Sequence, residues 1–299
     1  MDKRGQWWRV KRAVTQAGKV LTGRQMAGRA ATIFPDDVYL VSYPRSGNTW
    51  TRFLLGNFLY PTPATFSNIE QRVAEIYFNP DHILRKLKRP RLLKSHEAFH
   101  PGYPSIIYIV RDPRDVAISF YHHNLKAGNI PDGFPMDEFV AGFIVAKYDH
   151  WWGSWGDNVQ SWLSMRQGHD SFLLLRYEEM KDDPQRELLK VAGYLRARGF
   201  PAVDCSAENL ARAVELSSPE RMRALEQQEG KKYAQLKNTR MDKPFVRSAK
   251  AGGWKSTLSP SAVGLIESAW GPLMKTFGYE LTVSGAPDRN LQTTTAPSR

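Results

Sequence analysis

Short apolar runs alternate with segments of helical periodicity along most of the chain. Four runs have the length and the aliphatic content of buried strands, at residues 38–41, 91–96, 105–110 and 172–177. Apolar residues at helical spacing predict helices at 50–58, 67–78, from Pro113 onward, 187–198 and 259–276, and two short helices within 207–228 that are split at 217–219. Strands that alternate with helices predict an α/β fold, with a central parallel sheet covered by helices on both faces.

The composition predicts one globular domain. Hydrophobic residues make up 41% of the 299 residues and aromatic residues 12%, which excludes a disordered chain. There is no internal repeat and no change in composition before residue 284. We therefore expect a domain at 35–283, preceded by a basic extension at 1–34 and followed by a polar, disordered tail at 284–299.

The positive charge is concentrated at the N-terminus. The net charge is +12, and residues 1–30 contain eight Lys or Arg against one acid, Asp2. Apolar residues at helical spacing from Trp7 to Leu21 predict a basic amphipathic helix in this segment. Such a helix could lie on an anionic membrane as a peripheral contact, rest on nucleic acid, or pack loosely on its own domain.

The cysteine content and the length of the apolar runs indicate the cellular compartment. Cys205 is the only cysteine, so a disulfide framework is excluded and a reducing compartment is the simpler expectation. No run approaches eighteen apolar residues, so we expect no membrane span. Together these features favour a cytoplasmic protein.

The loop after the first strand predicts an anion site. Its residues 43–49, Tyr-Pro-Arg-Ser-Gly-Asn-Thr, join a strand to a helix that begins near Trp50. Backbone N–H groups and the helix dipole favour a phosphate or sulfate at such a junction, and Arg45 adds a cation. A nucleoside triphosphate loop needs Lys after the last glycine, whereas Asn48 follows Gly47. An ordinary strand–turn–helix with a solvated Arg45 is the alternative.

Further polar residues follow the other strands. Lys94 and His96 end the second strand, Arg111 the third and Tyr177 the fourth. In parallel sheets ligands bind at the carboxyl ends of the strands, so these side chains are expected to lie together. Taken singly, Arg111 could form a local ion pair with Asp112. The hydroxyl of Ser119, two turns along the next helix, could likewise bond to its own helix.

Four segments together resemble the cytosolic-type sulfotransferases. Residues 43–50, YPRSGNTW, are similar to the YPKSGTTW loop of that family. Residues 109–119, IVRDPRDVAIS, preserve the family's spacing of eight between Arg111 and Ser119. LRYEEMKDDP at 175–184 and FVRSAKAGGW at 245–254 are similar to two later motifs. The resemblance implies a P-loop-like domain that uses 3′-phosphoadenosine-5′-phosphosulfate (PAPS) as co-substrate and requires no metal.

The resemblance also implies a set of donor-binding residues. The 5′-phosphosulfate would lie against the first loop, through Arg45, Ser46, Gly47, Asn48 and Thr49. The adenine would contact Trp50, Tyr177 and Ser217, and the 3′-phosphate would contact Arg111, Ser119, Arg247, Ser248 and Ala249. Two of these depart from the family, because Ser248 and Ala249 replace a Lys and a Gly that usually grip the phosphate.

The same resemblance implies the catalytic groups. The segment Lys94-Ser95-His96 is similar to the family's KTH, whose His is the general base. A neutral His suits the removal of a proton from an acceptor hydroxyl or amine, and Lys94 and Arg45 would neutralise charge on the leaving oxygen. His100, His122 and His123 are alternatives as the base, but none lies in a matching motif.

The acceptor is not specified by any motif. Loops at 61–67, 77–90, 126–140 and 228–245 are expected to build its pocket. Charged residues in these loops favour a polar acceptor such as a sugar or a lipid headgroup: Asp81, Arg85, Lys86, Lys88, Lys231 and Lys232. Two other functions stay open, a P-loop nucleotide kinase or NTPase and a basic protein that binds nucleic acid or a membrane surface.

Overall fold

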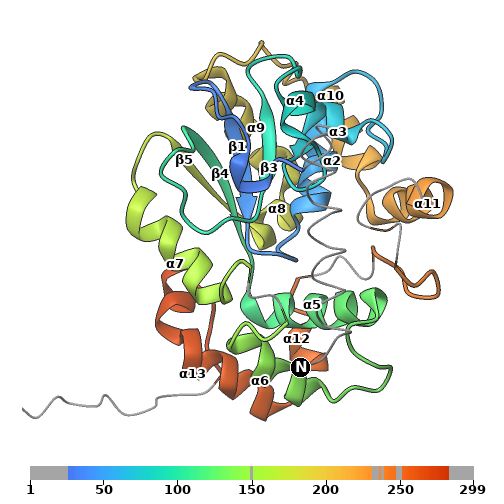
Figure 1. Ribbon diagram of the computed structural model, residues 1–299, viewed down its shortest axis with the longest axis vertical. Coiled ribbons are helices and arrows are strands. Elements are labelled where there is room, and N and C mark those ends of the chain that lie inside the picture. The colour runs from blue at the N-terminus through green and yellow to red at the C-terminus, as the bar shows by residue number, and fades with distance from the viewer. Residues whose placement is uncertain (1–25, 149–150, 231–235, 237–238, 247–250, 283–299) are drawn as a thin grey trace, which may run out of the picture.

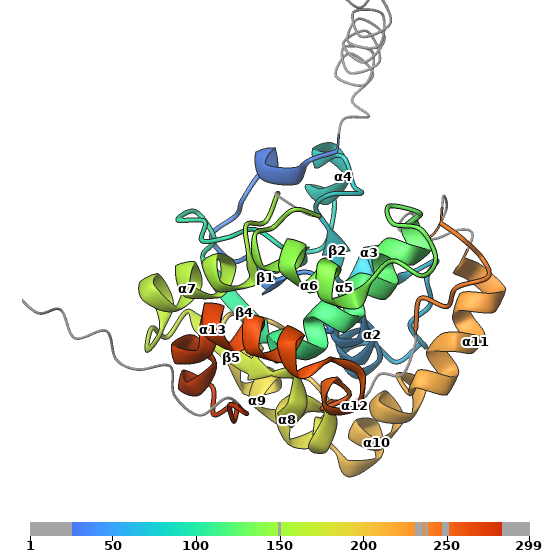
Figure 2. The ribbon, with the colours of Figure 1, turned by 90° about the horizontal axis from the view of Figure 1, so that it is seen from below.

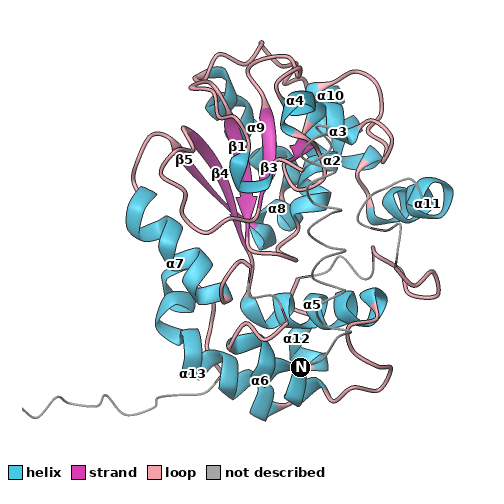
Figure 3. Ribbon diagram, in the orientation of Figure 1, coloured by secondary structure: helices cyan, strands magenta, loops and turns pink. Residues whose placement is uncertain are grey.

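The computed structural model describes residues 26–148, 151–230, 236, 239–246 and 251–282. Its centre is a five-stranded parallel sheet in the order β2-β3-β1-β4-β5 (Figure 3). The strands are β1 Val38–Ser42, β2 Ala74–Glu75, β3 Leu92–Ser95, β4 Ser105–Val110 and β5 Phe172–Arg176. The predicted α/β fold and its four principal strands are confirmed.

Helices cover both faces of the sheet. Side chains of β1 alternate, so that Val38 and Leu40 face one core and Tyr39 and Val41 face the other. The first core packs against α2 Asn48–Leu59, α9 Pro184–Arg196 and α10 Ala207–Leu216. The second packs against α5 Pro113–Ala127, α6 Met136–Ile144, α7 Trp155–Arg166 and α13 Pro260–Thr276.

The remaining helices are short or lie at the edges of the molecule. They are η1 Gly28–Ala30, α3 Ile69–Arg72, α4 Asp81–Leu84, α8 Tyr177–Asp182, α11 Pro219–Glu229 and α12 Trp254–Thr257. The predicted split of 207–228 into two helices is confirmed, since Ser218 caps α11 and Pro219 begins it. None of the described helices is both long and apolar enough to cross a membrane.

The expected helix at 67–78 is wrong. Only α3 is helical there, and the chain then extends into β2 at the edge of the sheet. Ala74 pairs with Leu93 and Glu75 pairs with Lys94 in parallel register. The apolar residues of this segment satisfy a helical pattern, but the exposed edge of β3 offers backbone partners that the local sequence cannot reveal.

The start of α5 marks the end of the molecule where the carboxyl ends of the strands lie. Because α5 follows β4 directly, it lies at the carboxyl end of the sheet, where α6, α12 and α13 gather with it (Figure 1). Seen from that end, α5 crosses in front of the sheet and α10 lies beside α2 (Figure 2).

The first described residues pack on the domain. Ala27 is buried, and the hydroxyl of Thr32 donates to Asp81 at 2.8 Å. The predicted amphipathic helix between Trp7 and Leu21 lies outside the described residues, as do the tail at 284–299 and residues 231 and 232.

Candidate active site

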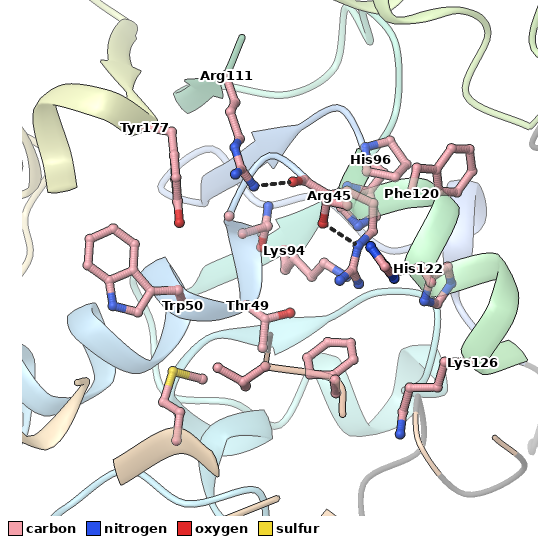
Figure 4. A pocket seen from close by; sticks show the side chains of 18 of the residues that line it. Arg45, Thr49, Trp50, Lys94, His96, Arg111, Phe120, His122, Lys126 and Tyr177 are labelled. Atoms are coloured by element: carbon pink, nitrogen blue, oxygen red, sulfur yellow. Dashed lines mark hydrogen bonds between the residues drawn. The ribbon is translucent and has the colours of Figure 1, made fainter. Parts of the chain in front are cut away.

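A cavity of about 400 Å³ lies at the carboxyl ends of the strands. Ten of the residues predicted from the sequence line it: Arg45, Gly47, Asn48, Thr49, Trp50, Lys94, His96, Arg111, Ser119 and Tyr177. Figure 4 shows Trp50 and Tyr177 on one side and His96, Phe120 and His122 on the other, with Arg45 and Lys94 between them. Ser46 and Ser217 do not line the cavity. Arg247, Ser248 and Ala249 lie outside the described residues.

The loop between β1 and α2 turns sharply beneath this cavity. Arg45 has φ 70° and Gly47 has φ 94°, both in the left-handed region. A Cβ atom on Gly47 would overlap the ring of Tyr177, so only glycine fits at this point. Gly47 is also the N-cap of α2, which places the first N–H groups of the helix at the loop.

Two polar atoms of the loop are buried without a hydrogen-bond partner among the described residues. They are Oγ of Ser46, a residue with 0% exposure, and Oδ1 of Asn48. Nδ2 of Asn48 is engaged, since it donates to the hydroxyl of Ser42 at 3.1 Å. Buried polar atoms without partners are costly, and an anion at the loop would accept a hydrogen bond from the Ser46 hydroxyl.

Arg45 connects this loop to the residues that follow β4. Its Nε donates to Oγ of Ser119 at 3.3 Å, and its own carbonyl accepts from Nη1 of Arg111 at 3.3 Å. The guanidinium of Arg111 lies 4.3 Å from the centre of the Tyr177 ring. Two cations from different strand ends therefore line one wall of the cavity, which suits a ligand with more than one negative charge.

Asp115 connects the motif at 109–119 to the motif at 245–254. This contact was not predicted from the sequence. Its carboxylate accepts from the backbone N–H groups of Gly252 at 2.7 Å and Trp254 at 3.0 Å. Burial raises the pKa of this carboxyl, and the Arg111 cation opposes the rise. The contact places the start of α12 beside α5.

Trp50 and Tyr177 form an aromatic corner at one side of the cavity. Their rings meet edge to face at 5.8 Å, and Trp50 Nε1 donates to the carbonyl of Ser217 at 3.0 Å. The hydroxyl of Ser217 instead donates to the carbonyl of Ala213 at 2.7 Å and accepts from Asn57 at 2.9 Å. Ser217 therefore positions Trp50 through its backbone, and its side chain points away from the cavity.

The tautomer of His96 follows from its hydrogen bond. Nδ1 lies 2.7 Å from the carbonyl oxygen of Ser42, which can only accept, so Nδ1 carries the proton and Nε2 carries the lone pair. Burial holds the pKa of His96 well below its ordinary value, and the neighbouring cations Lys94 and Arg45 lower it further. Tyr77 and Trp152 lie beside the imidazole, with ring centres at 6.4 and 5.9 Å.

Lys94 lies deep in the cavity wall beside a carboxylate that the sequence did not indicate. Its Nζ donates to Oε1 of Glu75, and Glu75 also contacts Arg52 at 3.4 Å. Burial lowers the pKa of Lys94, while the attraction of Glu75 acts in the opposite direction. Glu75 was missed because β2 was assigned to a helix.

Part of the remaining lining comes from the predicted acceptor loops. Tyr77 and Phe78 belong to 77–90, Lys126 to 126–140, and Pro244 and Phe245 to 228–245. No described residue of 61–67 lines the cavity. Asp81, Arg85, Lys86 and Lys88, four of the charged residues that favoured a polar acceptor, do not line it either.

The three alternative histidines occupy different positions. His100 lies outside the cavity and stacks on Tyr103 at 4.5 Å. His122 and His123 line the cavity from α5. Four-residue spacing places His123 one helical turn after Ser119, a signal that the sequence contained but that no motif marked.

The described residues hold no group of three or more His, Cys, Asp or Glu side chains arranged to bind a metal ion.

Comparison with known proteins identifies the family to which the chain belongs. The family model for the sulfotransferase domain matches residues 35–278. Mouse sulfotransferase 1B1 is 28% identical over 242 residues, which cover 74% of this chain and 77% of that protein. Human sulfotransferase 2B1 is 28% identical over 208 residues, covering 64% of this chain and 55% of that protein.

A solved structure has a similar fold. Mouse sulfotransferase SULT7A1, complexed with PAP, superposes with a TM-score of 0.65 at 23% identity, covering 84% of this chain and 88% of that one. Since the family model spans most of the chain, the resemblance indicated by the four motifs is confirmed, and the chain belongs to the sulfotransferase domain family.

Proposed function

We propose that the protein transfers a sulfuryl group from PAPS to a hydroxyl or amine of a small-molecule acceptor, with His96 as the general base. The observation that carries this proposal is the hydrogen bond between His96 Nδ1 and the carbonyl of Ser42, at 2.7 Å. It leaves the lone pair on Nε2, in a cavity that also contains the anion loop.

The donor would bind along the loop and the wall formed by the two arginines. The N–H groups at the start of α2 would hold the 5′-phosphosulfate, and Ser46 and Asn48 are assigned to the same end of the donor by their motif. The edge-to-face pair of Trp50 and Tyr177 offers an aromatic surface for the adenine.

The 3′-phosphate would lie near Arg111 and Ser119. Ser119 accepts from Arg45 at 3.3 Å, so Arg45 lies between the two predicted ends of the donor. Arg247, Ser248 and Ala249 are proposed to complete this end on the basis of their motif alone. The bound PAP in the mouse structure belongs to that protein and is consistent with this proposal.

The reaction would proceed by in-line displacement. The acceptor hydroxyl gives its proton to His96 Nε2 as its oxygen forms a bond to sulfur, and the bond from sulfur to the bridging oxygen breaks. The electron pair of that bond stays on the phosphate of the leaving nucleotide. Lys94 and Arg45 would stabilise this negative charge from the cavity wall.

Binding of the negatively charged donor would raise the pKa of His96. In the described structure burial, Lys94 and Arg45 together hold the pKa of His96 well below its ordinary value, which keeps the ring neutral. The phosphates of PAPS would offset those cations and thereby raise this pKa, so the base would become stronger when the donor is bound.

Substitution of His96 tests this proposal. We expect His96→Ala to lower kcat by about 10²- to 10⁴-fold, because the base is lost. The affinity for PAP, measured by calorimetry, should change by no more than about threefold, which is under 1 kcal/mol. His100→Ala is the matched control, since His100 lies outside the cavity. Unchanged turnover in His96→Ala would overturn the assignment of the base.

A further inference from the structure

His123 is a histidine of the cavity that the proposed reaction does not use. It lies on α5, and its ring packs parallel to that of Phe120, with centres 6.3 Å apart and planes 10° apart. Nδ1 of His123 is buried and has no hydrogen-bond partner among the described residues. His123 lines the cavity, and the described residues leave its hydrogen-bonding capacity unused.

Burial and the nearby cations keep the imidazole of His123 neutral. Burial lowers its pKa to about 3, and the nearby cations Arg45, Lys126 and Lys94 act in the same direction. Lys126 is engaged elsewhere, since its Nζ donates to the carbonyls of Arg240 at 3.0 Å and Lys243 at 2.5 Å. A neutral imidazole has one nitrogen that donates and one that accepts, so it can bind a hydroxyl or an amine in either sense.

His123 and His96 differ in what fixes their protons. The carbonyl of Ser42 sets the tautomer of His96, as the 2.7 Å hydrogen bond shows. No hydrogen bond to a described residue sets the tautomer of His123. Both histidines lie in the field of Arg45 and Lys94, where the sulfuryl group would be transferred. The lone pair on Nε2 of His96 is therefore available to accept a proton, whereas His123 can present either a donor or an acceptor to a ligand.

The walls between the two histidines favour a ring-shaped acceptor. Tyr77 and Trp152 lie beside His96, and Phe120 lies against His123. Flat aromatic surfaces bind rings well and contribute little to the binding of flexible polar chains.

We propose that His123 determines acceptor specificity by forming a hydrogen bond to a second hydroxyl or amino group on a ring-shaped acceptor. The substrate class is therefore a ring with two polar groups, one of which reacts at His96 while the other binds His123. This inference rests on the proposed function, because it assumes that His96 deprotonates the reacting group.

Matched pairs of acceptors test the inference with PAPS as donor. The pairs are 4-ethylcatechol with 4-ethylphenol and trans-1,2-cyclohexanediol with cyclohexanol. We expect the wild type to favour the member with two hydroxyls by about 10- to 100-fold in kcat/KM in at least one pair, since that member can form a second hydrogen bond, to His123.

Three variants distinguish a hydrogen bond from His123 to the acceptor from packing of the acceptor against the His123 ring. In His123→Phe the preference should fall to within about threefold, because the ring is kept and the hydrogen bond is lost. His123→Gln retains a donor and an acceptor, so it should keep part of the preference. His100→Phe is the control outside the cavity and should keep all of it. PAP affinity, measured for every variant, shows that the fold and the donor site are intact.

The outcomes distinguish the two proposals. The inference is overturned if His123→Phe keeps the wild-type preference, or if the wild type favours the members with one hydroxyl. It is also overturned if the wild type binds PAP but turns over none of the four acceptors. Failure of the wild type to bind PAP would instead contradict the proposed function.

Discussion

Three histidines of this chain show how surroundings decide the role of a residue. His96 is held by the carbonyl of Ser42, His123 is partly buried near cations, and His100 stacks on Tyr103 outside the cavity. The motif identified His96 correctly as a residue of the cavity. It could not rank His123, because the depth of a helical residue depends on which elements pack around it.

The burial of neutral histidines makes stability depend on pH. The pKa of His123 is about 3 in the folded protein against an ordinary value of 6.5, so the unfolded chain binds more protons below pH 6.5. Stability should therefore be fully present above that pH and fall as the pH drops. His123 alone should remove about 2 kcal/mol between pH 7 and pH 5. His96, whose pKa is also lowered, should add to the loss.

Urea unfolding at pH 7 and pH 5 measures this effect. The loss of stability in His123→Phe should be smaller than in the wild type by about 2 kcal/mol, because other titrating groups cancel in the comparison. Equal losses in the two proteins would mean that His123 is not held neutral in the folded state.

At the scale of elements, the site depends on how strands end and helices begin. The β1–α2 connection reverses through two residues with positive φ, Arg45 and Gly47. The second connection, from β4 to α5, is fixed by Asp112, whose side chain accepts from the backbone N–H of Arg114 at 2.9 Å. Both junctions were visible in the sequence, because Gly and the Asp-Pro pair are strong local signals.

Gly47→Ala should disrupt the first junction. The new Cβ would meet the ring of Tyr177 and would also occupy an unfavourable φ of 94°. We expect a loss of roughly 2–5 kcal/mol in stability, from backbone strain together with overpacking. PAP affinity should fall by about tenfold or more, which corresponds to 1.4 kcal/mol.

Gly128→Ala provides a control for strain alone. Gly128 ends α5 with φ 74°, and nothing lies within 4 Å of the added Cβ. This variant should lose about 1–2 kcal/mol in urea unfolding and keep its PAP affinity. If the two variants bind PAP equally well, the contact between Gly47 and Tyr177 does not support the donor site.

At the scale of the whole molecule, a buried arginine joins the site to the C-terminal helix. Arg114 pairs with Asp112 and Glu267, with N···O distances of 2.6 Å to each, and its guanidinium lies 3.7 Å from the Trp254 ring centre. These residues come from α5, α12 and α13, so the network holds distant segments together behind the cavity.

Removal of this arginine should destabilise the whole domain. Arg114→Met leaves the carboxylates of Asp112 and Glu267 buried without their partner, which should cost about 3–5 kcal/mol in urea unfolding. Arg85→Met removes a pair whose arginine is 55% exposed, with Asp81 at 3.2 Å, and should cost no more than about 1 kcal/mol. Similar losses of stability in both variants would show that the Arg114 network stabilises the domain no more than an exposed ion pair does.

The error at residues 67–78 shows where local patterns fail. The sequence predicted a helix there, but Glu75 pairs with Lys94 across the sheet edge and brings its carboxylate into the cavity wall. A strand of two residues has too little periodicity to be recognised, since its pairing comes from β3 and not from its own side chains.

Local patterns in the chain were enough to predict the α/β fold, the strand–loop–helix junction at 43–49 and the place of His96 at a strand end. These features depend on periodicity and on turn residues, which act over a few positions. The pairing of Glu75 with Lys94, the orientation of Ser217 away from the cavity and the position of His123 in the cavity lining became visible only in the folded structure. Such contacts join residues from separate elements, and packing, not local propensity, brings them together.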